Sequence, residues 1–165
     1  IVLHCIGDFE RISDHAINIM EAAQEMHNKK LTFSPKAEEE LKVFSRAVQD
    51  IVEKAYAVFR DQDEKLAQKV EPLEAVVDDL NQEVKKRHIR RLRNGKCTIE
   101  LGFILSDITT SLERVADHCS NIAVCVTQVR DDTYDTHGYL NSVKNEDSEI
   151  FRGLVLEAEE KYLLP

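Results

Sequence analysis

Apolar residues recur at helical spacing along most of the chain, and no segment shows the strict alternation typical of a half-buried strand. The pattern predicts four long helices, with approximate bounds Val2 to His27, Pro35 to Arg60, Asp61 or Asp63 to Arg93, and Thr98 to Gln128. The connections between the last three helices are short, which favours antiparallel neighbours. We therefore expect an all-α antiparallel helical bundle.

Residues that favour or break helices mark the expected ends. Ser34 and Pro35 suit the N-cap and first position of the second helix, and Asn94-Gly95 is a typical helix stop. Pro72 lies inside the third predicted helix and should kink it, because proline removes a backbone donor. Beyond residue 131 we expect a loop, then a short helix from about Asp147 to Tyr162 that covers the bundle as a strap.

One charged phrase occurs twice in the chain, as FERISDHAINI from Phe9 and as LERVADHCSNI from Leu112. When the two are aligned on their first Glu, the Glu, Arg, Asp, His, Asn and Ile positions coincide. Each phrase contains a Glu-xxx-Asp pair, and a third pair lies in the third predicted helix. The three pairs are Glu10 and Asp14, Glu74 and Asp78, and Glu113 and Asp117.

A spacing of four places two carboxylates on one face of a helix, where like charges cost a few tenths of a kcal/mol unless they are compensated. All three pairs fall on the flank of their helix, outside the apolar stripe. Because the third and fourth helices should be antiparallel, their four carboxylates could meet at a common seam. Such a cluster predicts a bound cation, and oxygen ligands suit Mg, Ca, Mn or iron. The alternative interpretation is an ordinary solvated acidic face.

Composition supports the helical prediction and narrows the class of partner. Hydrophobic residues make up 42% of the chain and charged residues 32%, with only five Gly and three Pro, which suits amphipathic helices. The net charge of −9 disfavours nucleic acid and favours metal cations or basic partners. No apolar run approaches the ~18 residues of a membrane span. Four cysteines without a CxxC pair favour a reducing, cytosolic setting.

Other polar residues have simpler interpretations. His15 and His118 each follow the motif Asp and point elsewhere on the helix, so we interpret them as packing or hydrogen-bonding residues. Basic residues at the end of the third helix suit either a solvated helix end or contact with an anionic partner or headgroup; they are Lys85, Lys86, Arg87, Arg90, Arg91 and Arg93. The sequence shows no phosphate-cradling Gly loop, nucleophile elbow, zinc spacing or Glu-xx-His di-iron spacing, and we expect no enzyme.

The phrases ERISDHAINI and ERVADHCSNI resemble the PhoU family, cytosolic regulators of phosphate transport whose Glu/Asp-xxx-Asp motif recurs in each of two three-helix repeats. The resemblance runs from about Asp8 to Arg130 and explains the repeated phrase as an internal duplication. It implies multinuclear metal sites on the bundle surface. The tail segments DTHGYL and EKYLLP are similar to the end of the PhoU-like cytosolic region of bacterial sodium/phosphate cotransporters.

The resemblance implies three segments. Residues 1–30 would be the last helix of a truncated first repeat, 31–131 the second three-helix repeat, and 132–165 a tail with a short helix. Because the rest of the first repeat is absent, the first helix should pack on the other three helices or on a second chain. The implied metal ligands, for divalent or iron-type ions of unspecified identity, are Glu74, Asp78, Glu113 and Asp117, with Glu10 and Asp14 lacking their partner helix.

The function implied by the resemblance is a metal-binding regulatory domain of a phosphate transport system. It would form part of a sodium-dependent phosphate cotransporter, as a soluble domain on the cytoplasmic side of the cell membrane. Its partners would be the transporter membrane domain or phosphate transport and sensing proteins, and it could form a homo-oligomer. The alternative function is a purely structural helical oligomerisation module that binds no metal.

Overall fold

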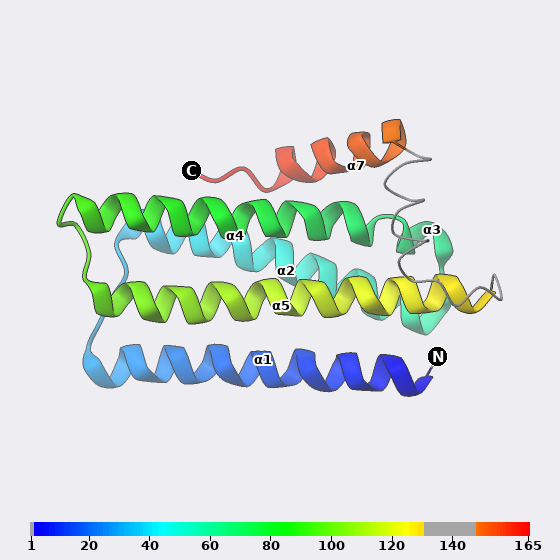
Figure 1. Ribbon diagram of the computed structural model, residues 1–165, viewed down its shortest axis with the longest axis horizontal. Coiled ribbons are helices and arrows are strands. Elements are labelled where there is room, and N and C mark those ends of the chain that lie inside the picture. Colours follow the sequence, from blue (N-terminus) through cyan, green and yellow to red (C-terminus); the bar gives the residue numbers. More distant parts are fainter. Residues whose placement is uncertain (1, 131–147) are drawn as a thin grey trace.

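The computed structural model describes residues 2–130 and 148–165 (Figure 1). All regular structure within these ranges is helical, so the predicted all-α bundle is confirmed. After the first helix come three long helices, each antiparallel to the one before it, and a last helix lies along the outside of the bundle. The elements are α1 (Val2–Lys29), α2 (Pro35–Asp61), α3 (Glu64–Ala67), α4 (Val70–Arg93), α5 (Ile99–Arg130) and α7 (Ser148–Lys161).

Side chains and special backbone conformations fix the ends of α2, α3 and α4. Ser34 is extended, and its Oγ accepts a hydrogen bond from the Ala37 amide at 3.3 Å, while Pro35 occupies the first helical position. Asp63 caps α3 in the same way, accepting from the Leu66 amide at 3.1 Å. Gly95, at φ 66°, lies in the left-handed region just after α4. These ends lie close to the predicted ones.

The disturbance expected from Pro72 is present, but as a break in the helix one turn earlier and not as a kink at Pro72 itself. The chain instead turns at Gln68 and Lys69, between the four-residue α3 and the start of α4 at Val70. Pro72 therefore lies in the first turn of α4, where the backbone N–H groups have no partner within the helix. Its missing donor costs nothing there, and α4 continues without interruption to Arg93.

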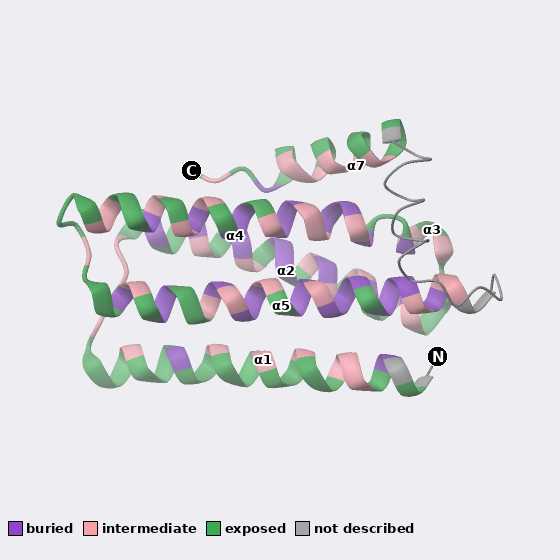
Figure 2. Ribbon diagram, viewed as in Figure 1, coloured by how far each residue is buried: buried purple, intermediate pink, exposed green. Residues whose placement is uncertain are grey.

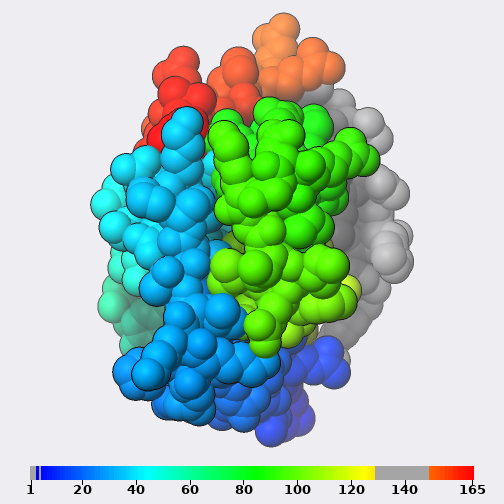
Figure 3. Space-filling view, turned by 90° about the vertical axis from the view of Figure 1, so that its left-hand side faces the viewer, coloured from blue at the N-terminus to red at the C-terminus, as the bar shows by residue number. Residues whose placement is uncertain are grey.

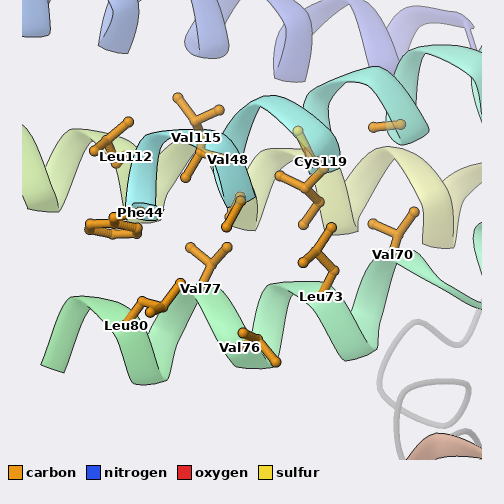
Figure 4. Close-up of a cluster of buried hydrophobic side chains, with 14 of the residues drawn as sticks. Phe44, Val48, Val70, Leu73, Val76, Val77, Leu80, Leu112, Val115 and Cys119 are labelled. Carbon is orange, nitrogen blue, oxygen red and sulfur yellow. The ribbon is translucent and has the colours of Figure 1, made fainter. Parts of the chain in front are cut away.

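The core lies between α2, α4 and α5. Figure 4 shows Phe44 and Val48 of α2 meeting Val77 of α4, with Leu112 and Val115 of α5 beside them. Phe44 and Val77 are fully buried. At about 25 cal/mol per Å² of apolar surface, burial of these side chains is the main force that holds the three helices together. The metal candidates on α4 and α5 are therefore attached to helices that form the buried core.

Helix α1 forms an outer layer that packs along α5, opposite α4 (Figure 1). Its Phe9 ring also meets Phe59 of α2 edge-on at 5.3 Å. Packing within the chain is one of the two arrangements expected for this helix. Much of its surface is nevertheless solvent-exposed, as Figure 2 shows, including Ile17 and Met20 at 50% and 61%. Self-association through α1 stays a prediction.

The expected C-terminal strap is present as α7, which lies along α4. Its end is anchored on α2, where Asp50 accepts hydrogen bonds from the Tyr162 hydroxyl at 2.7 Å and the Lys161 ammonium at 3.0 Å. The loop expected between residue 131 and this helix lies outside the described residues. Among the helices that the structure describes, none is long and apolar enough to cross a membrane.

Candidate metal centre

Three carboxylates converge at the seam between α4 and α5. Glu74 and Asp78 lie one turn apart on α4, and Asp117 faces them from α5. One oxygen atom from each lies within 4.8 Å of the other two, and all three residues are half-buried. The predicted meeting of acids from the third and fourth helices is thus present for these three residues, because the helices are antiparallel and the pairs share a flank.

Glu113, the fourth predicted ligand, lies beside this group without joining it. The negative charge of Glu113 still acts on the site. Burial, and then the negative charges of Glu113 and Asp117, raise the pKa of Asp78 above its usual value. The Oδ1 atom of Asp78 is buried and has no hydrogen-bond partner among the described residues. The acids therefore repel one another, and a buried acceptor is left unsatisfied.

These features fit a cation. Three carboxylates from two helices supply hard oxygen donors, which suit Mg²⁺, Mn²⁺, Ca²⁺ or iron better than soft metals. Arg114 pairs with Asp117 at 3.2 Å, but more than half of the Arg114 side chain is exposed. Such a pair is weak and would yield to a bound ion.

The seam contains a polar contact that sequence reasoning missed. Glu71, one turn before Glu74, accepts a hydrogen bond of 2.5 Å from the Ser120 hydroxyl, one turn beyond Asp117. The spacing of Glu71, Glu74 and Asp78 places all three on one side of α4, so the sequence alone could have indicated that Glu71 also lies at the seam. This contact fixes the register of α4 against α5 and so positions the acids.

The first repeated pair does not join the group. Glu10 and Asp14 are both exposed on α1, and neither belongs to a cluster of three or more potential ligands within residues 2–130 and 148–165. Their role as ligands stays a prediction.

The two motif histidines form a contact between α1 and α5. The rings of His15 and His118 stack with centroids 5.8 Å apart, and Nδ1 of His118 lies 2.9 Å from Oδ1 of Asp8. Burial, then the nearby His118 and Arg114, lower the pKa of His15. Packing is confirmed for both histidines and hydrogen bonding for His118, whereas Nδ1 of His15 is buried without a hydrogen-bond partner among the described residues. Asp8 was missed as the partner of His118, because a contact across 110 residues leaves no local signal.

The basic end of α4 is partly used inside the chain. Arg91 forms two hydrogen bonds of 2.9 and 2.8 Å with the carboxylate of Glu40, and Arg87 approaches the same carboxylate at 3.4 Å. Glu40 is only 3% exposed. The interpretation of these two arginines as a solvated helix end is therefore wrong, because they bind the buried Glu40 of α2.

Comparison with known proteins gives a family match over the segment that contains the candidate metal centre. The model of the PhoU domain family matches residues 41–126, which include the seam between α4 and α5. A protein of Thermotoga maritima (strain ATCC 43589 / DSM 3109 / JCM 10099 / NBRC 100826 / MSB8), described as "Phosphate-specific transport system accessory protein PhoU homolog 1", is 29% identical over 121 residues. The alignment covers 73% of this chain and 51% of that protein, so the chain spans about half the length of this relative. No solved structure matches the chain.

Proposed function

Because this chain belongs to the PhoU domain family, we propose that it is a non-enzymatic regulatory domain of a phosphate transport system, with a metal site at Glu74, Asp78 and Asp117. The observation that carries the metal site is the convergence of three carboxylates around the unpartnered Oδ1 of Asp78. The similarity to a phosphate transport accessory protein supports the role in phosphate transport.

The residues of the site would act by joining two helices. A divalent or iron-type ion supplies positive charge and accepts oxygen ligands when bound. Glu74 and Asp78 hold the α4 side of the seam and Asp117 holds the α5 side, with Glu113 adding negative charge nearby. Binding offsets the repulsion among these acids, so occupancy would stiffen the α4–α5 pair. A regulatory domain can use that change in stiffness to alter its fit to a partner.

The finer assignment is to the cytoplasmic side of a sodium-dependent phosphate cotransporter, whose membrane domain would be the partner. The support is the similarity of the tail segments DTHGYL and EKYLLP to the ends of such regions. The experiment measures uptake of labelled phosphate by cells that make the full-length protein containing this chain, with and without Asp78→Asn. Altered sodium-dependent uptake in the variant supports the assignment, whereas uptake that does not depend on this protein contradicts it.

A second candidate function is a structural oligomerisation module without metal. Exposed apolar side chains on α1, including Ile6, Ile17 and Met20, favour a further packing partner. Metal analysis separates the two functions. Protein purified without chelators should contain a metal that Glu74→Gln removes; a metal-free protein with an unchanged oligomeric state in both forms would favour the structural module.

A further inference from the structure

A second polar site lies at the opposite end of α4 from the acids. A groove with a volume of about 570 Å³ runs between the start of α2 and the end of α4, within the size range of small-molecule sites. Figure 3 faces this end of the bundle and shows the start of α2 and the end of α4 side by side. Five cationic side chains line the groove: Lys36, Arg87, Arg90, Arg91 and Lys96.

Among the residues that the structure describes, two acidic side chains line the same groove, and both are paired with an arginine. Glu40 is held by the forked hydrogen bonds from Arg91, and Glu83 accepts a hydrogen bond from Arg87 at 3.1 Å. Counted over side chains alone, five cations against two acids leave a formal excess of three positive charges. The backbone oxygen of Pro165 also lines the groove and accepts a hydrogen bond from Arg87 at 2.5 Å. This excess stands out in a chain whose net charge is −9.

Three of the five cationic side chains remain available to bind an anion. Lys36, Arg90 and Lys96 form no ion pair with any residue that the structure describes, whereas Arg87 and Arg91 form the floor with Glu40. Lys36 and Arg90 are exposed and come from different helices, so an anion between them would meet donors from two sides. The N-terminus of the 27-residue α2 adds the favourable end of its dipole at the same place.

We propose that this groove binds a phosphate group, either free in solution or carried by a small molecule or a lipid headgroup. Phosphate presents several charged acceptor oxygens, which matches guanidinium and ammonium donors that converge from separate elements. The site is independent of the metal centre, because Arg90 lies twelve residues beyond Asp78 on α4, roughly 18 Å along the helix axis. It also explains why these basic residues gather in a chain that is otherwise acidic.

The test uses inorganic phosphate and pyrophosphate as soluble probes in isothermal titration calorimetry at fixed ionic strength. The protein is first stripped of metal with a chelator, which is then dialysed away, so that no ion at the acidic seam can recruit phosphate. The test variant is Lys36→Gln with Arg90→Gln. The matched control is Arg46→Gln with Lys65→Gln, which removes the same two charge types from exposed positions that have no ion pair in the described chain.

A second arm measures sedimentation with vesicles of phosphatidylglycerol or of phosphatidylcholine. Loss of two charged hydrogen bonds should weaken binding at least about tenfold in the test variant and leave the control unchanged. Binding of soluble probes with this dependence supports a free or small-molecule phosphate, and the same dependence seen only with phosphatidylglycerol vesicles supports a headgroup. Absence of binding in both arms, or equal weakening in both variants, would overturn the proposal.

Discussion

Replacing Arg91 with Met should cost about 3–5 kcal/mol of folding stability, because it leaves a buried carboxylate without its partner. The side chains of Glu40 and Arg91 are only 4% and 14% exposed, so solvent screens their interaction little. Two hydrogen bonds, of 2.9 and 2.8 Å, are lost together. Arg87, at 3.4 Å from the same carboxylate, can take over part of the role, which favours the lower half of the range.

Thermal and urea denaturation measure this effect. For a chain of this size each kcal/mol shifts Tm by roughly 2–4 °C, so a cost of about 3–4 kcal/mol gives a decrease of about 6–16 °C. The double variant Glu40→Leu with Arg91→Met should recover most of the loss, since it removes the unpaired charge. Lys29→Met is the control, because its ion pairs are nearly half exposed and should be worth less than about 1 kcal/mol. Equal small losses for Arg91→Met and the control would refute the reasoning.

Three further predictions concern other parts of the fold. Burial alone would raise the pKa of Asp50, but hydrogen bonds from Lys54, Tyr162 and Lys161 outweigh it and lower the pKa to about 2. The ionised Asp50 should therefore contribute about 1–2 kcal/mol to folding stability above pH 3.8, and this contribution should disappear as pH falls through 2. Asp50→Asn should remove this acid dependence from the denaturation curve. A thiol reagent should label Cys97 before Cys119 in the native protein, as mapped by mass spectrometry, because burial and then Asp8 raise the pKa of Cys119 to about 12. Amides of α1 should exchange hydrogen faster than those of α5, which packs on three long helices; equal protection would show that α1 has a further partner.

Helical periodicity was sufficient to predict most of the fold. The apolar stripes of α2, α4 and α5 predicted both the helices and the faces that meet, because residues such as Phe44 and Val77 recur at the spacing of a buried face. The break before α4 was predicted only as a kink at Pro72. Gln68 and Lys69 are ordinary helix formers, so the position of Pro72 was the only local signal, and it suits a first turn as well as a kink.

The candidate site was predicted in part, for reasons of geometry. Glu74, Asp78 and Asp117 could be placed together because two antiparallel helices with acids on matching flanks bring those flanks to one seam. The contact of Asp8 with His118 depends on how α1 packs, which spacing alone does not determine. The burial of Glu40 had a signal that was overlooked, since it lies four residues before Phe44 on the apolar stripe.

The central claim is that the acids at the α4–α5 seam form a metal site. The most direct measurement is a thermal melt of metal-stripped protein with and without added Mg²⁺, Mn²⁺ or Fe²⁺, on wild type and on Asp78→Asn with Asp117→Asn. An ion at a hundred times its Kd should stabilise the wild type by about 2.7 kcal/mol. The double variant should fold and lose this gain, while the matched change on α1, Glu10→Gln with Asp14→Asn, should keep it. An equal gain in wild type and the seam variant, or no gain in either, would contradict the claim.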